Sequence, residues 1–346
     1  MYYNKYRKRG KLFPVLTGGI KMLNLIRMNL FRLVHTKSAI IVFCLLMGFS
    51  VLNGCMSAYD QEEKKKAIEE QKKAGIWEPD QSGKLTPEEE KELQEKAAME
   101  EAEDNKENND VYDAGYEFGS QMSANIGIYV STPVDTDGNL MDYLYLYCEE
   151  LGSGILLLFI LIGAVLFFRG DEKNGFLKNI AGQTKHRYNI FFSKLVVIGI
   201  YTFVCMAGYM VVEFAAFKCG WLIGADIDFG VKLIPDALRF FVLEYLLYMA
   251  FISGLLLITE VTKNTAAAIT IGMCGLFGFG IFFSGLVQKI FHTDFNIAKY
   301  YINTNISNLY LGMDWDAIWF VLGIGTGFLV IYNFLNVLWF SRKDIV

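Results

Sequence analysis

The chain has 346 residues, of which 53% are apolar and 20% are charged, and its mean hydropathy of +0.30 excludes an ordinary water-soluble globular protein. The net charge of −5 is divided unevenly, because residues 58–149 carry −15 and the rest of the chain carries +10. We therefore expect an all-α polytopic membrane protein with one large acidic insert outside the bilayer.

The first 38 residues are basic and contain an amphipathic stretch. They hold nine Lys and Arg side chains and no acidic one. Within MLNLIRMNLFRLVHTK, apolar side chains recur at helical spacing on one stripe: Leu23, Ile26, Leu30 and Leu33. Basic residues beside this stripe can reach lipid headgroups, which is typical of a helix lying in the membrane interface. The pattern predicts an interfacial helix on the inner leaflet that turns into the first span near Lys37.

Six stretches are apolar enough to cross a bilayer, for which a helix needs about 20 residues. They are residues 39–57, 151–168, 195–217, 238–259, 265–287 and 317–340. Basic residues gather before the first, in the segment 169–194 and after the last, and basic loops stay in the cytoplasm. We expect a protein of the bacterial cytoplasmic membrane with both chain ends on the cytoplasmic side. The first span should be a membrane anchor rather than a cleaved signal peptide.

The insert between the first two spans, residues 58–149, is expected to be extracellular and largely helical. Its first part, about 58–73, should continue the helix of the first span. Thr86, followed by Pro87 and by Glu89, is a capping-box start with Pro at the first helical position, which predicts a second helix to about Asp104. The insert is interpreted either as a solvated spacer or as a lid or receptor contact over an exit path.

The sequence contains no recognisable catalytic or metal-binding pattern. It has no Gly-rich phosphate loop, no Gly-x-Ser-x-Gly elbow, and no zinc or redox spacing among its six Cys and three His. We expect no catalytic residue, no metal site, no cofactor in this chain and no nucleic-acid partner. Cys55 and Cys148 bracket the insert, and both a disulfide between them and simple packing of the thiols remain open.

Two acidic residues fall inside predicted spans. Glu213 lies in the third span and Glu244 in the fourth, each within about two turns of the outer end of its span. Ionisable groups at such depth are expensive and often functional. They are candidates for a substrate path or a gate, and structural pairing or an interfacial position is the alternative.

The loop between spans two and three carries a charged pattern at helical spacing. Glu172, Gly175 and Lys178 recur every three residues, which places them along one side of a short helix at about 171–182. Arg187 and Lys194 follow near the membrane. This order resembles the ABC type-2 exporter permeases, which have an inner-leaflet helix, six spans and an acidic-x-x-Gly-x-x-basic coupling helix between spans two and three. The long acidic insert departs from the simpler members of that family.

The resemblance implies a non-catalytic permease subunit of an ATP-driven exporter. Two ABC ATPase subunits, which would bring ATP and Mg, would dock on the coupling residues Glu172, Gly175, Lys178 and Arg187. A second permease, identical or homologous, would complete the path through the lipid bilayer. The 28 Phe, 19 Tyr and 13 Met favour a hydrophobic or amphipathic substrate, such as a peptide toxin or an antimicrobial peptide whose export gives antibiotic resistance. The alternative is a membrane sensor whose acidic insert binds a ligand.

Overall fold

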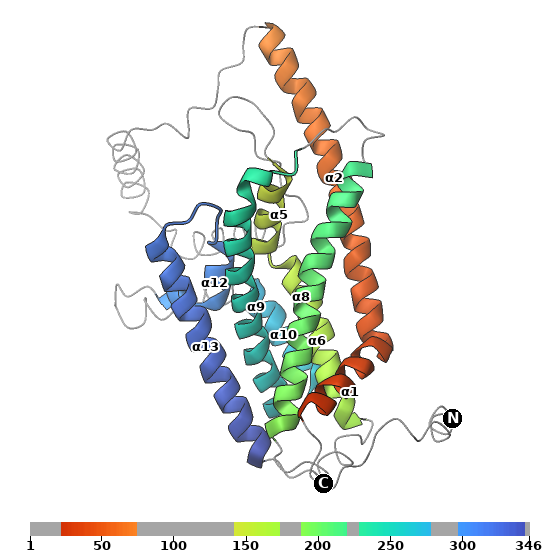
Figure 1. Cartoon of the computed structure of the whole chain (residues 1–346), viewed down its shortest axis with the longest axis vertical. Coiled ribbons are helices and arrows are strands. Elements are labelled where there is room, and N and C mark those ends of the chain that lie inside the picture. Colours follow the sequence, from red (N-terminus) through yellow and green to blue (C-terminus); the bar gives the residue numbers. More distant parts are fainter. Residues whose placement is uncertain (1–21, 75–141, 174–187, 220–227, 278–296, 343–346) are drawn as a thin grey trace, which may run out of the picture.

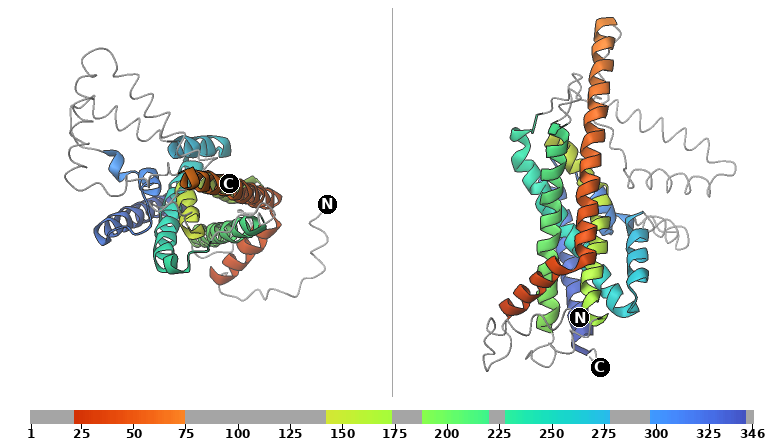
Figure 2. Two further views of the ribbon diagram at one scale, coloured as in Figure 1. Left: turned by 90° about the horizontal axis from the view of Figure 1, so that it is seen from above. Right: turned by 90° about the vertical axis from the view of Figure 1, so that its right-hand side faces the viewer.

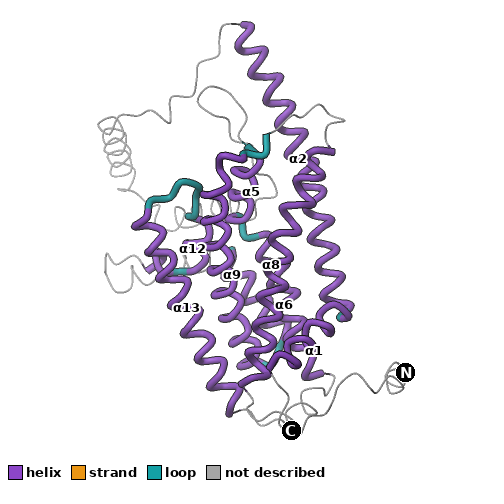
Figure 3. The backbone as a smooth tube through the Cα atoms, in the orientation of Figure 1, coloured by secondary structure: helices purple, strands orange, loops and turns teal. Residues whose placement is uncertain are grey.

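The structure is a computed structural model that describes residues 22–74, 142–173, 188–219, 228–277 and 297–342. Every regular element in these ranges is a helix (Figure 3). The α-helices are α1 (Met22–His35), α2 (Lys37–Ala74), α5 (Tyr143–Gly152), α6 (Ile155–Lys173), α8 (Tyr188–Cys219), α9 (Ile234–Thr262), α10 (Thr265–Leu276), α12 (Ile302–Ser307) and α13 (Trp315–Arg342). Two 3-10 helices are η5 (Val231–Leu233) and η6 (Ile297–Tyr300). The long helices run side by side as a bundle (Figure 1), which confirms the all-α fold class.

Four stretches of helix are long and apolar enough to cross a membrane by length and composition. They lie in α2 (Lys37–Tyr59), α8 (Tyr188–Cys219), η5 with α9 (Val231–Thr262) and α13 (Trp315–Phe340). The pair α5 and α6 counts as a fifth if its two helices form one bent span. Of the predicted span 265–287, α10 occupies the first part, and the remainder lies outside the described residues. The expected total of six spans therefore stays a prediction.

The predicted second span is broken rather than continuous. α5 and α6 meet at an angle of 55°, and the chain between them is Ser153–Gly154. Gly154 has a φ of +78°, a left-handed conformation that glycine adopts without the steric cost other residues pay. The Ser153 hydroxyl and backbone N–H both donate to the Glu150 carbonyl and close the end of α5. Residues 143–149, which sequence reasoning assigns to the insert, form buried helix instead.

Helix α1, which the sequence predicted to lie in the membrane interface, ends at His35, and α2 begins at Lys37, where the sequence predicted the turn into the first span. α1 packs against the beginning of α8, but through Leu25, Asn29 and Leu33. Leu23, from the predicted stripe, is 58% exposed. Leu33 of the predicted apolar stripe is thus part of the face that α1 turns toward α8, and this face also contains a polar residue. The placement of the stripe in the membrane interface stays a prediction. The Asn29 amide donates to the Ser193 hydroxyl at 2.9 Å.

Helix α2 is one continuous element of 38 residues, about 57 Å long. Its second half projects beyond the other helices (Figures 1 and 2), in agreement with the helix expected over 58–73. Lys66 pairs with Glu62 at 2.6 Å on this projection, and the hydrogen bond and charge of that carboxylate raise the pKa of Lys66. The second predicted insert helix, from Pro87 to Asp104, lies outside the described residues.

Helix α9 lies at the centre of the packing. It contacts α13, α10, α5, α6 and α12, and more than half of its most apolar stretch is buried. α2 and α8 form a second closely packed pair. α13 is largely exposed, and its outward side chains include Trp319, Phe334 and Trp339, as expected for a surface in contact with lipid. Helix α5 lies against this arrangement, within reach of both α8 and α9.

Candidate functional site

A group of buried polar side chains connects three helices. Asn53 comes from α2, Tyr143 and Glu150 from α5, and Tyr209 and Glu213 from α8. Glu150 is 7% exposed and Glu213 is 2% exposed. The acidic cluster, as we call these five residues, therefore sits inside the apolar bundle. There, each polar atom needs a partner to offset the loss of water.

The Asn53 amide joins the two glutamates of the acidic cluster. Its nitrogen donates to Oε1 of Glu150 and to Oε1 of Glu213, the second at 3.0 Å. The Tyr209 hydroxyl lies within 3.3 Å of the same nitrogen. Because an amide carries two hydrogens, it serves two of these three acceptors at a time. One neutral side chain thus holds two carboxyl groups next to each other.

The tyrosines supply the remaining hydrogen bonds of the acidic cluster. The Tyr209 hydroxyl donates to Oε2 of Glu150 at 3.1 Å. The Tyr143 hydroxyl lies 3.0 Å from Oε2 of Glu213 and 2.8 Å from the Met210 carbonyl, but it has a single proton to donate. Within the described residues, neither glutamate forms a salt bridge. The two carboxyl groups are therefore satisfied by neutral donors alone.

Glu244 occupies a separate position on the other side of α5. It follows the first residue of α9 by ten positions, nearly three turns, which is deeper than the two turns that the sequence predicted. Glu244 is fully buried, and neither of its carboxyl oxygens has a hydrogen-bond partner among the residues that the structure describes. The Tyr248 hydroxyl, one turn further along α9, donates to the Leu151 carbonyl at 2.6 Å. Glu213 and Glu244 thus flank α5 and are not brought into one hydrogen-bonded group.

The predicted coupling residues fall at the edge of the described chain. Glu172 lies in the last turn of α6, whereas Gly175, Lys178 and Arg187 lie outside the described residues. Their assignment as ATPase contacts stays a prediction.

The ends of the two helices on either side of this segment are held together by one buried side chain. Lys194 of α8 is 1% exposed, and its ammonium donates to the Phe168 carbonyl of α6 at 3.1 Å. The same ammonium lies 4.7 Å from the centre of the Phe168 ring, within the range of a cation–π interaction. The end of α6 and the beginning of α8 are therefore fastened to each other.

The sequence did not predict four members of the acidic cluster: Asn53, Tyr143, Glu150 and Tyr209. The sequence alone places residues 143–149 in the exposed insert, because their tyrosines and Glu149 precede the continuous apolar run. A usable signal was present, since Tyr143, Tyr147 and Glu150 recur at the four- and three-residue spacing of one helix face. Asn53 is also the one strongly polar amide in the first apolar stretch.

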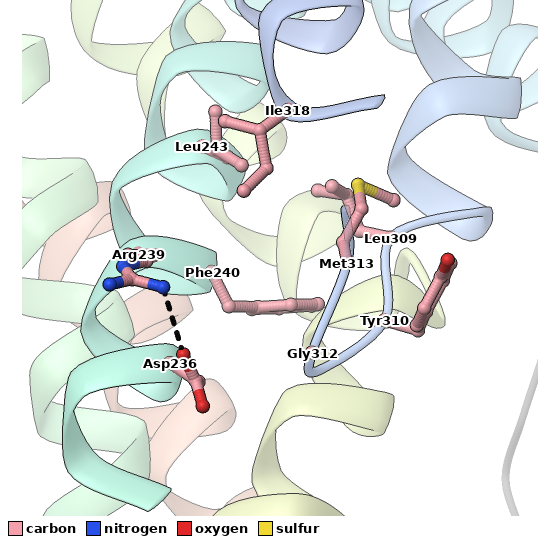
Figure 4. Close-up of a pocket in the computed structure, with 9 residues that line it drawn as sticks. All are labelled: Asp236, Arg239, Phe240, Leu243, Leu309, Tyr310, Gly312, Met313 and Ile318. Carbon is pink, nitrogen blue, oxygen red and sulfur yellow. Dashed lines mark hydrogen bonds and ion pairs between the residues drawn. The ribbon is translucent and has the colours of Figure 1, made fainter. Parts of the chain in front are cut away.

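A small pocket lies near the beginning of α9, beside the segment that links α12 to α13 (Figure 4). One wall carries the ion pair of Asp236 with Arg239, whose atoms are 3.1 Å apart. Phe240 points into the pocket between this pair and the apolar side chains of Leu243 and Ile318. The pocket therefore offers a charged pair on one side and apolar surface on the other.

One comparison with known proteins gives a match. Residues 126–280 match the model of a family described as ABC-2 family transporter protein. The matched region runs from before α5 to beyond α10 and includes Glu150, Glu213 and Glu244. No curated protein and no solved structure matches the chain. Over these 155 of the 346 residues, the match supports the family that the coupling pattern suggested.

Proposed function

We propose that this chain, which belongs to the ABC-2 transporter family, is the permease subunit of an ATP-driven exporter of hydrophobic or amphipathic molecules. Family membership makes it an integral membrane component of an ABC transporter, and this observation carries the proposal. The family also implies an ABC ATPase partner and a second permease. We place the assembly in a bacterial cytoplasmic membrane with both chain ends inside.

The ATPase would dock on the segment between α6 and α8. The contacts around this segment support the idea, because they join its two flanks to the rest of the bundle. Lys194 ties the beginning of α8 to the Phe168 carbonyl of α6. The Arg169 guanidinium, one residue later on α6, donates to the Lys263 carbonyl in the turn between α9 and α10. A displacement imposed on the segment would thus reach four helices.

The substrate would be amphipathic, with a peptide toxin or an antimicrobial peptide as the preferred class. The surface beside α9 supports this choice, since it sets the Asp236–Arg239 pair next to an apolar wall of side chains. A polysaccharide has few apolar groups that could pack against that apolar wall. Glu213 and Glu244 would border the path from within the bundle.

Coexpression with candidate ABC ATPases tests the proposal. We expect a stable complex with one of them, in which the membrane subunits raise ATP hydrolysis. Replacing both Glu172 and Gly175 by Arg should abolish the complex, because bulk and a reversed charge at the dock prevent close approach. Glu62→Arg, on the projecting part of α2, is the matched control and should leave the complex intact. If the double variant binds the ATPase as well as the wild type does, the proposed dock is wrong.

Substrate class can be tested with inverted membrane vesicles that contain the reconstituted complex. ATP should drive uptake of a fluorescent amphipathic helical peptide and not of a dextran of similar mass. Equal handling of both probes would contradict the substrate assignment. A chain that responds to an external ligand and stays active without any ATPase would instead indicate the sensor function.

A further inference from the structure

Among the carboxyl groups of the described residues, that of Glu244 is buried with the fewest hydrogen bonds to compensate for the loss of water. Its side chain is fully buried, and neither oxygen receives a hydrogen bond. A carboxylate in an apolar interior is very costly unless it is paired with a cation or has several donors. The site therefore needs a positive charge, and no side chain in the described part of the chain supplies one through a hydrogen bond.

The hydroxyl group of Tyr248 indicates whether the protonated or the ionised form of Glu244 fits the site. Tyr248 faces Glu244, but its single proton is donated to the Leu151 carbonyl at 2.6 Å. The Tyr248 oxygen can then only accept a further hydrogen bond. Among the described residues, Tyr147 and Cys148 of α5 are further titratable groups near Glu244. A protonated Glu244 could donate to Tyr248, whereas an ionised Glu244 would face the lone pairs of that oxygen.

The acidic cluster on the other side of α5 has the same shortage of positive charge. Glu150 and Glu213 share the Asn53 amide, and their other donors are the hydroxyls of Tyr209 and Tyr143. Two like charges held this closely in an apolar interior repel each other strongly, and one proton between them removes the repulsion. The hydrogen bonds leave room for that proton, because the Tyr143 hydroxyl also faces the Met210 carbonyl.

We propose that the three glutamates around α5 form a proton-binding site that holds two protons, one on Glu244 and one shared by Glu150 and Glu213. Tyr147, whose hydroxyl donates to the Met206 carbonyl of α8 at 2.9 Å, lies within electrostatic reach of all three carboxyl groups. The ligand of this site is the proton rather than a metal cation, because the described residues contain no group of three or more His, Cys, Asp or Glu side chains that could hold a metal ion. This inference concerns the chain alone and does not depend on ATPase docking.

Infrared spectroscopy of the purified full-length chain in nanodiscs tests the site directly, through the carbonyl absorption of protonated carboxyl groups at neutral pH. Glu244→Gln should remove one carboxyl equivalent of this absorption. The double variant Glu150→Gln with Glu213→Gln should also remove one equivalent, although it deletes two carboxyl groups. Glu149→Gln, an exposed neighbour on α5, is the matched control and should remove none.

Several results would overturn the proposal. One is a wild-type chain without protonated carboxyl absorption at neutral pH, which needs no variant to fold. Another is a Glu244→Gln spectrum equal to that of the wild type, or a double variant that loses no equivalent or two. Absorption that arises only when Na⁺ and K⁺ are replaced by choline would assign the site to a metal cation. As a second measurement, the melting temperature of the wild type should fall in alkaline buffer, and that of Glu244→Gln should fall less.

Discussion

The contact between α2 and α8 gives the sharpest test of the structure, because it depends on one glycine. A Cβ atom at Gly54 would lie 2.7 Å from the Glu213 carbonyl oxygen and 3.1 Å from the Cβ of Ala216. The nearest of these atoms belongs to the backbone and cannot rotate away. Gly54→Ala must therefore push α2 and α8 apart beside the acidic cluster. At Gly48, in the same span, an added Cβ would meet nothing within 4 Å.

The comparison of the two substitutions isolates the packing cost. Replacing Gly by Ala inside a helix favours folding by about 1 kcal/mol, and this gain is common to both positions. Forcing extra volume into a packed contact costs about 1–3 kcal/mol. Gly54→Ala should therefore have a free energy of unfolding about 1–3 kcal/mol below that of Gly48→Ala. The shift of α8 should also weaken the bond between Asn53 and Glu213, which is 3.0 Å long.

The assay is denaturant unfolding of the full chain in one detergent, followed by tryptophan fluorescence and compared among the wild type and both variants. Expression and detergent are held constant, so the difference between the variants does not depend on the absolute value of the free energy of unfolding. If Gly54→Ala proves as stable as Gly48→Ala, α2 and α8 do not approach each other as the structure has them, and the acidic cluster between them is misplaced.

Further substitutions probe other contacts. Asn53→Ala should lower the free energy of unfolding by about 1–3 kcal/mol, measured by the same denaturation, because both glutamates lose a buried donor. Asn264→Ala should cost about 1 kcal/mol and speed amide exchange in the first turn of α10, since the Asn264 oxygen caps the Ala266 N–H at 3.0 Å. Lys263→Gly should raise the melting temperature, because Lys263 has a φ of +52°. Lys194→Met should reduce ATPase stimulation more than complex formation, because the tie to α6 is lost.

For each of these predictions, a specific outcome would contradict it. An Asn53→Ala chain as stable as the wild type would show that the two glutamates do not depend on this amide. Unchanged exchange rates after Asn264→Ala would exclude the cap, and a lower melting temperature of Lys263→Gly would exclude backbone strain at that turn. Full ATPase stimulation with Lys194→Met would mean that the contact between Lys194 and α6 is not needed to transmit movement between the ATPase and the helices.

Much of the architecture was predictable because it depends on local sequence. The hydropathy of a stretch of about 20 residues decides whether it can cross a bilayer, and the basic leader predicted the turn from α1 into α2 at Lys37. The run of Glu and Lys after Tyr59 predicted the long projection of α2, since those residues favour helix without needing tertiary support. The order of charged residues after the second span also indicated the family.

The acidic cluster and the break in the second span were decided by tertiary structure. A spanning helix is apolar on all sides, so its sequence does not show which face meets another helix and which meets lipid. Asn53, Glu150 and Glu213 lie far apart in the chain and meet only because α2, α5 and α8 pack together. The bend at Gly154 turns Glu150 into that contact, and the run Gly152-Ser153-Gly154 lies in a stretch whose overall hydropathy does not show that the chain turns there.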